Sequence, residues 1–154
     1  MRKLYVIDTN CLIAFYRNVF KDAPDYQGSP ELSLRTKTII SQAIISRTTD
    51  IRLSIPSVVF VEIYEKWLKT EEFSRKFYYE IFSLLKQSPN VEVRSIDREV
   101  LENLIHIGGN LKNHDLHDKL VLASAITLES PLITTDNDVI NYVSQEKPIP
   151  GTLN

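Results

Sequence analysis

Short apolar runs alternate along this chain with longer segments that mix apolar and polar residues. Three of the runs are short and rich in strand-forming residues, and the first of them, residues 3–8, is typical of a strand buried on both faces. A fourth segment alternates strictly between apolar and polar residues, as a half-buried strand does. The predicted strands are KLYVID (3–8), IRLSIP (51–56), VEVRSI (91–96) and PLITT (131–135). The segment 147–154 is predicted to be either an edge strand or an irregular tail.

The segments between these strands place apolar residues three or four positions apart, which is typical of amphipathic helices. We predict that Ser57 and Ser74 are the N-caps of two of them and that Gly108-Gly109 ends another. The segment 21–30 contains two prolines and a glycine and is predicted to be a loop. The predicted helices cover residues 10–18, about 31–48, 57–69, 74–87, 97–108, 116–129 and 136–146.

Strands that alternate with helices predict an α/β fold. Each connection is long enough to cross over the sheet, so the strands should be parallel and both faces of the sheet should be covered by helices. The chain has 154 residues, 43% of them apolar and 25% charged, which suits one domain over residues 1–154. No apolar stretch is long enough to cross a bilayer, and the first one stops at Asp8, too early for a signal peptide. We therefore expect a cytoplasmic protein.

Acidic side chains directly follow two of the predicted strands. Asp8 ends the first of them and Asp136 follows the last. Because the carboxyl ends of parallel strands share one edge, both carboxylates should project where α/β sheets bind ligands. A short acid between a strand and a helix is also a good N-cap, and that interpretation stays open for both. Asp118 would lie in the first turn of a helix capped by Asp115, whose small residues allow a close approach to the sheet.

Glu62 is the only charged residue in the apolar run 58–64. The helical pattern puts its apolar stripe on another face, which predicts that Glu62 is exposed to solvent. If both faces of this helix are covered, Glu62 is instead a partly buried acid that needs a partner. The residues of the stripe are Phe60, Val61, Tyr64, Trp67 and Leu68.

Several carboxylates at one point would repel one another and would favour a bound cation. A cluster of oxygen ligands suits Mg²⁺ or Mn²⁺, whereas zinc usually recruits histidine or cysteine. The histidines, His106, His114 and His117, form no convincing metal site, and Cys11 is predicted to be a small core residue. The net charge of −2 argues against a simple basic groove for nucleic acid, but not against an enzyme with an acidic, cation-binding site.

Four segments, in this order, resemble the motifs of PIN-domain nucleases, the family that includes the VapC-type toxins. They are VIDTNCLIAF, SVVFVEIYE, LHDKLVLASAI and LITTDND, and together they extend over almost the whole chain. The resemblance implies an α/β/α sandwich around a parallel sheet of four or five strands. It also implies RNA cleavage that depends on Mg²⁺ or Mn²⁺, with Asp8, Glu62, Asp118 and Asp136 as catalytic acids and metal ligands. On this basis Glu62 is assigned to the site although its periodicity places it on the surface.

The resemblance also suggests supporting residues and partners. Thr9, Asn10 and Thr134 would support the site, Asp138 could replace or assist Asp136 as a metal ligand, and Lys119 could contact RNA. The toxins of this family pair with an antitoxin and often form homodimers. The aromatic residues of 57–87 could serve the core or such an interface; they include Tyr64, Trp67, Phe77, Tyr78, Tyr79 and Phe82.

Three other functions are alternatives to this one. The chain could be a stand-alone PIN-type nuclease that processes RNA, or a degenerate, non-catalytic binding domain whose acids only cap helices. A phosphohydrolase of the haloacid-dehalogenase type also begins with an aspartate after its first strand. That chemistry needs a second aspartate two residues later, where this chain has Asn10, so it is disfavoured.

Overall fold

The computed structural model describes residues 3–27 and 29–154. The first two residues of the domain predicted over 1–154, and Gly28 of the predicted loop 21–30, lie outside the described residues. In chain order the elements are β1 (Lys3–Ile7), α1 (Thr9–Val19), α2 (Leu34–Ile45), β2 (Ile51–Pro56), α3 (Ser57–Lys66), α4 (Glu71–Phe77), a π-helical turn (Tyr78–Phe82), α5 (Ser83–Gln87), β3 (Val91–Arg94), α6 (Arg98–Ile107), α7 (Leu116–Leu128), β4 (Leu132–Ile133), α8 (Asn137–Glu146) and β5 (Thr152–Leu153).

The strands form one parallel sheet in the order β3-β2-β1-β4-β5. Val6 of β1 pairs with Ser54 of β2 on one side and with Leu132 of β4 on the other. The chain first moves outward from β1 to β3 and then returns to build β4 and β5 on the other side of β1. The order of the strands therefore reverses between β1 and β4, the place where open α/β sheets most often bind ligands.

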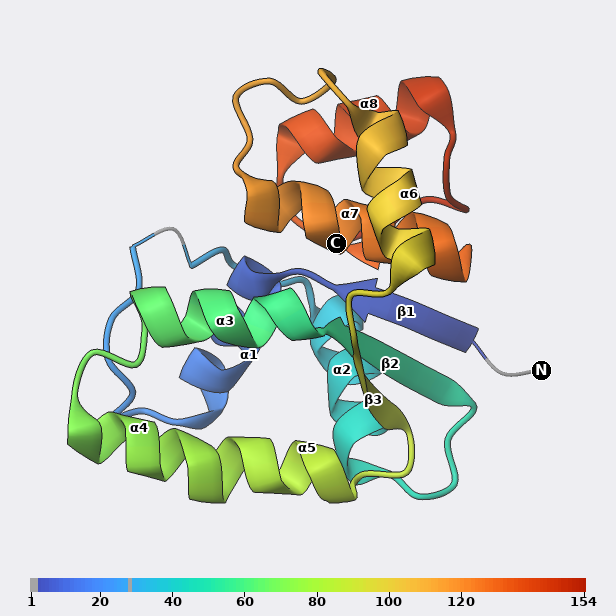
Figure 1. Ribbon diagram of the computed structural model, residues 1–154. Coiled ribbons are helices and arrows are strands. Elements are labelled where there is room, and N and C mark those ends of the chain that lie inside the picture. The colour runs from blue at the N-terminus through green and yellow to red at the C-terminus, as the bar shows by residue number, and fades with distance from the viewer. Residues whose placement is uncertain (1–2, 28) are drawn as a thin grey trace.

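Helices cover both faces of the sheet, as predicted for an α/β/α sandwich. In Figure 1, α6, α7 and α8 lie above the strands, and α2, α4 and α5 lie below them. The middle strands are buried on both faces because of this cover; Val6, Ile7, Leu53, Ile55 and Ile133 are fully buried. A rigid core therefore supports the ends of β1 and β4.

Two predicted N-caps are wrong. The third helix follows Pro56 directly and has no side-chain cap, and Ser57 is its first residue. The N-cap of the next helix lies four residues earlier than predicted, at Thr70, whose side chain accepts a hydrogen bond from the amide of Phe73. The caps Asp8, Asp97, Asp115 and Asp136 all accept hydrogen bonds from the first turns of their helices.

The remaining boundaries differ from the predictions by a few residues. The helix predicted over 31–48 begins only after its cap Ser33, and the strand predicted over 131–135 is two residues long. The C-terminal segment forms β5, an edge strand parallel to β4, so the first of its two predicted forms is correct. Cys11 is fully buried in the core, as predicted.

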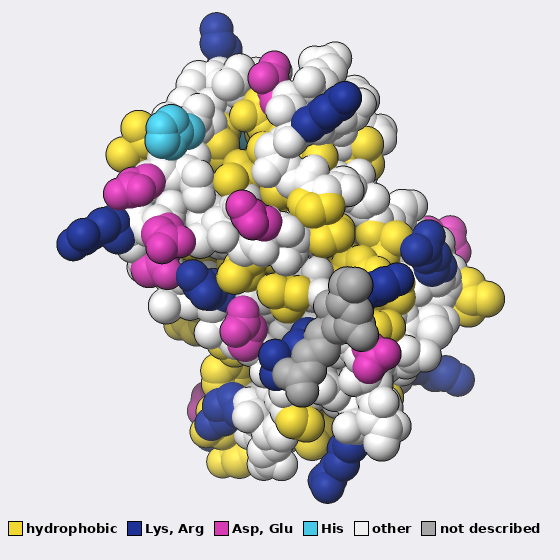
Figure 2. Space-filling model, turned by 90° about the vertical axis from the view of Figure 1, so that its right-hand side faces the viewer, with side chains coloured by type: hydrophobic (Ala, Val, Ile, Leu, Met, Phe, Trp, Pro, Cys, Tyr) yellow, Lys and Arg dark blue, Asp and Glu magenta, His cyan; other side chains and the backbone are white. Residues whose placement is uncertain are grey.

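The face near the amino end of β1 carries a mixed charge. Figure 2 shows basic and acidic side chains scattered among one another over this face, together with apolar side chains. Among residues 3–27 and 29–154, no helix is both long and apolar enough to span a membrane.

Candidate functional site

Asp8 and Asp136 follow the neighbouring strands β1 and β4 at the point where the strand order reverses. Oδ1 of Asp8 accepts a hydrogen bond of 2.9 Å from the amide of Cys11. Oδ1 of Asp136 accepts hydrogen bonds from the amides of Asp138, at 2.9 Å, and Val139, at 3.2 Å. Both aspartates therefore cap helices, but each uses only one carboxylate oxygen to do so. A capping role and a ligand role are compatible in this geometry.

Asp118, in the first turn of α7, shares a hollow with these two aspartates. The hollow has a volume of about 140 Å³ and is lined by Asp8, Thr9, Asn10, Asp118, Thr135 and Asp136. We call it the aspartate hollow. Thr134 lines an adjoining smaller pocket together with the same three aspartates, and its hydroxyl accepts a hydrogen bond from the amide of Asp136. The fold thus gathers three of the four predicted acids, and the three predicted supporting residues, at one edge of the sheet.

The other two predicted polar residues lie outside the lining of this hollow. Asp138 is exposed on the first turn of α8; its amide donates to Asp136, and one of its carboxylate oxygens lies within 4.8 Å of a carboxylate oxygen of Asp136. Lys119 follows Asp118 on α7 and is partly buried. Tyr16 of α1 is buried and stacks on Phe20, so its ring belongs to the core and is not available to an RNA base.

The carboxylates of the aspartate hollow carry unfavourable negative charge. Burial raises the pKa of Asp8 above its ordinary value, and hydrogen bonding from Thr134 and Cys11 offsets this only in part. Burial, followed by the charges of Asp115 and Glu62, raises the pKa of Asp118 to about 6. A cation in the hollow would relieve both effects.

Glu62 is buried, so the prediction that its side chain faces solvent is wrong. Only 3% of the residue is exposed, whereas Val61 and Tyr64 of the supposed apolar stripe are 51% and 68% exposed. The reason is tertiary: α3 contacts both α1 and α7, and these helices cover the face that carries Glu62. The hydroxyl of Thr9 donates a hydrogen bond to Oε1 of Glu62, and Nζ of Lys66 lies 2.6 Å from Oε2.

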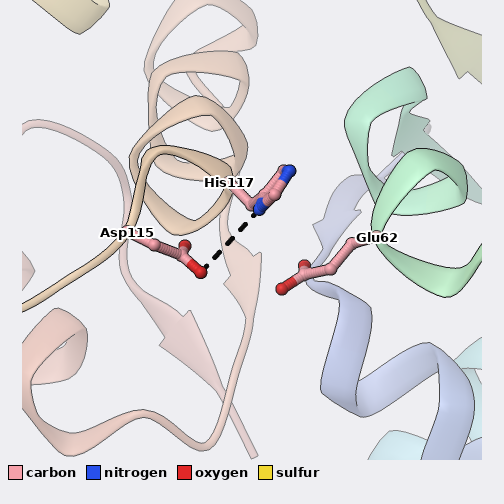
Figure 3. A group of neighbouring side chains, drawn as sticks. All are labelled: Glu62, Asp115 and His117. Atoms are coloured by element: carbon pink, nitrogen blue, oxygen red, sulfur yellow. Dashed lines mark ion pairs between the residues drawn. The ribbon is translucent and has the colours of Figure 1, made fainter. Parts of the chain in front are cut away.

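Glu62 belongs to a second polar group beside the aspartate hollow. Figure 3 shows Glu62 on α3 pointing toward Asp115, which caps α7, with His117 beside them. One ligand atom from each of these residues lies within 4.8 Å of the others, and Nδ1 of His117 is 3.8 Å from Oδ2 of Asp115. Thr9 connects the two groups, because it lines the hollow and also binds Glu62.

The three aspartates of the hollow stand farther apart than the residues of this second group. In the described parts of the chain, the sets of three ligand atoms within 4.8 Å of one another are Glu62 with Asp115 and His117, and His114 with Asp136 and Asp138. An ion in the hollow would therefore contact some aspartates through water. Mg²⁺ suits such a site, because it retains several of its waters when a protein binds it.

Several polar residues at this edge were not predicted from the sequence. Nε2 of His114 lies 2.7 Å from Oδ2 of Asp136, and the hydroxyl of Tyr26 donates a 3.1 Å hydrogen bond to Oδ1 of Asn10. His114 and Tyr26 come from irregular segments that carry no periodic signal. Lys66 could have been found, because glutamate followed by lysine four residues later is a favourable helical pair.

Comparison with known proteins identifies the fold. No protein-family model matches the sequence, and no curated protein is significantly similar to it. The solved structures that resemble the chain include VapBC2 from Rickettsia felis bound to a promoter DNA fragment, VapBC-1 from nontypeable Haemophilus influenzae, and a toxin–antitoxin complex from Klebsiella pneumoniae. Their TM-scores are 0.58, 0.60 and 0.51, and their identities to this chain 15%, 16% and 17%, respectively. The fold is PIN-like.

The PIN-like fold extends over nearly the whole molecule. The match to the Rickettsia felis complex covers 98% of this chain and 98% of the matched chain, and the other two cover at least 92% of each chain. The expected α/β/α sandwich around a parallel sheet of four or five strands is therefore confirmed, and the sheet has five. At this level of identity the likeness establishes the fold alone.

Proposed function

We propose that this chain is a metal-dependent endoribonuclease, the VapC-like toxin of a toxin–antitoxin pair. The observation that carries the proposal is the aspartate hollow: Asp8, Asp118 and Asp136 come from three distant parts of the sequence and line one cavity where the strand order reverses. The PIN-like fold and its likeness to three toxin–antitoxin complexes support the same conclusion.

The residues of the hollow fit Mg²⁺ or Mn²⁺. Every side chain that lines it carries at least one oxygen atom, and Asn10 carries an amide nitrogen as well. Hard divalent cations prefer oxygen ligands. Burial, and to a smaller extent neighbouring carboxylates, raise the pKa values of Asp8 and Asp118, and a bound cation would favour their charged forms. Asp8, Asp118 and Asp136 would hold the ion, directly or through water. When bound, the ion would lower the pKa of a water and neutralise charge on the attacked phosphate.

The other residues of the site would orient what the aspartates hold. The hydroxyl of Thr134 accepts a hydrogen bond from the amide of Asp136 and so fixes that residue. The hydroxyl of Thr9 donates to Glu62 and fixes it beside the hollow. Asn10 lines the hollow and is exposed; Tyr26 donates to its side-chain oxygen, and its amide nitrogen would donate to a phosphate. Lys119 would contact the RNA backbone. Hydrolysis would break the bond from phosphorus to the 3′ oxygen and leave 5′-phosphate and 3′-hydroxyl ends.

The proposal includes an antitoxin partner and a homodimer in the cytoplasm. The aromatic residues of 57–87 divide into two groups: Trp67 and Phe77 are core residues, whereas Tyr64 and Tyr79 are 68% and 71% exposed. The exposed group offers apolar contact surface of the kind that is enriched at protein interfaces.

The test is RNA cleavage by wild-type protein and by Asp8→Asn. Asparagine is as good an N-cap as aspartate, so this change removes the charge from the site but retains the cap of α1. We expect the rate with Mn²⁺ to fall at least about 100-fold, since even residues that only support a metal ligand contribute 10- to 100-fold. EDTA should abolish wild-type cleavage. Asp97→Asn is the matched control and should retain activity, because it also removes the charge of a capping aspartate but lies outside the lining of the hollow.

Two outcomes would contradict the proposal. Full cleavage by Asp8→Asn would show that this aspartate is not a ligand. No cleavage of structured or single-stranded RNA by the wild-type protein, with Mg²⁺ or Mn²⁺, would favour the non-catalytic binding domain instead.

A further inference from the structure

Lys66, the last residue of α3, places a positive charge inside the second polar group. Its Nζ lies 2.6 Å from Oε2 of Glu62 and 3.9 Å from Oδ2 of Asp115. The Glu62 side chain is only 5% exposed, whereas that of Lys66 is 42% exposed. The ammonium group therefore covers the buried carboxylate from the solvent side. Three N–H groups are available on an ammonium, and one of them donates to Glu62.

Both oxygens of Glu62 are engaged in this arrangement. Oε1 accepts from the hydroxyl of Thr9, and Oε2 accepts from Lys66. A divalent ion placed against Glu62 and Asp115 would lie within a few ångströms of the ammonium group, and the two cations would repel each other. As long as Lys66 remains in place, this part of the site is closed to a metal ion.

The aspartate hollow differs in this respect. In the described parts of the chain, no lysine or arginine forms a salt bridge with Asp8, Asp118 or Asp136. Among the described residues, the histidine that contacts these aspartates is His114, whose Nε2 lies 2.7 Å from Oδ2 of Asp136. The site is thus divided into a group of aspartates that lack a lysine or arginine counter-ion and a glutamate group that already has one.

We propose that Lys66 occupies the place of a second metal ion, so that the site binds one divalent cation per chain. This inference rests on the proposed function, which supplies the first ion. Nucleases with two metal ions use them on either side of the attacked phosphate. A lysine ammonium is a compact point charge and can neutralise phosphate charge at one of those positions. The N–H groups that Glu62 leaves free would donate to a non-bridging phosphate oxygen of the RNA.

The test counts bound Mn²⁺ by electron paramagnetic resonance and by calorimetry, and it does not depend on catalysis. Wild-type protein should bind one ion per chain. Lys66→Met retains most of the length of the side chain but removes its charge, so Glu62, Asp115 and His117 should become free to bind a second ion. Lys66→Arg, which keeps the charge, should bind one ion. Lys69→Met is the matched control, because Lys69 donates to the backbone oxygen of Glu65 and, among the described residues, forms no salt bridge with Glu62 or Asp115. It should also bind one ion.

The outcomes separate the two proposals. Two ions in the wild-type protein would overturn the role of Lys66 and leave the nuclease intact, and this measurement needs no variant to fold. One ion in a folded Lys66→Met protein would also overturn it. No bound ion in the wild-type protein would overturn the proposed function and, with it, this inference.

Discussion

The hydroxyl of Thr9 donates a hydrogen bond to Oε1 of Glu62, which is 53 residues away in the sequence. Both residues are 3% exposed. The bond joins the start of α1, where the chain leaves β1, to the middle of α3. It therefore fixes the position of the glutamate relative to Asp8 and the aspartate hollow.

Replacing Thr9 by valine should destabilise the protein. Valine has nearly the same shape but no hydroxyl, so one oxygen of a buried carboxylate loses its partner. The free energy of unfolding should fall by about 1–3 kcal/mol, measured by urea denaturation. Thr9→Ser keeps the hydroxyl and loses one methyl group, so its free energy of unfolding should fall by less than that of Thr9→Val. Equal midpoints for wild type and Thr9→Val would show that this hydrogen bond contributes nothing.

Asp118 should make the metal-free protein less stable as the pH rises. Its pKa is about 6 in the folded protein and near the ordinary 3.8 when unfolded. Between these two values the folded state binds more protons than the unfolded state, so stability decreases with increasing pH.

The variant Asp118→Asn removes this titration. In EDTA at pH 7 it should be more stable than wild type by about 1 kcal/mol, since partial solvent exposure screens part of the repulsion. The difference should disappear toward pH 4. Added Mn²⁺ should reverse the order, because only the wild type retains the ligand. Thermal unfolding across this pH range measures both effects, and a difference that does not change with pH would contradict the assigned pKa.

The order of strands and helices could be predicted because local pattern determines it. Buried strands and amphipathic helices have different periods, and the aspartate caps mark where several helices begin. The caps of α3 and α4 could not be predicted in the same way. Thr70 and Ser74 are both acceptable caps by sequence, and the choice of Thr70 depends on how the chain packs. The two-residue strand β5 likewise exists only because β4 lies beside it.

The site could be predicted where it coincides with the strand ends, and not elsewhere. Asp8 and Asp136 are marked by the strands that precede them. Glu62 has no such mark, since its burial depends on two helices that pack on α3 from distant parts of the chain. His114 lies in the irregular segment between α6 and α7, where no periodicity indicates which way a side chain points.

His114 should position Asp136 for metal binding. Its Nε2 is 2.7 Å from Oδ2, the carboxylate oxygen that does not cap α8, and its side chain is 8% exposed. His114→Leu should weaken Mn²⁺ binding by about 10- to 100-fold, the usual effect of removing a residue that orients a metal ligand. His114→Gln can place a donor near the same point and should retain most of the affinity. Calorimetry measures both, and unchanged affinity in His114→Leu would exclude the positioning role.

The small residues of α7 should control how close Asp118 comes to the sheet. Ala123 is fully buried on a helix that contacts β1, β2 and α3. Leucine at this position adds three carbon atoms to a packed interior, so Ala123→Leu should lower the free energy of unfolding by about 1–3 kcal/mol. It should also weaken Mn²⁺ binding, because α7 carries Asp118 and must move outward. Ile105→Ala, at a position that is 76% exposed on α6, is the control and should change stability by no more than about 0.5 kcal/mol. If Ala123→Leu loses stability but binds Mn²⁺ as tightly as the wild type, the packing of α7 does not set the geometry of the aspartate hollow.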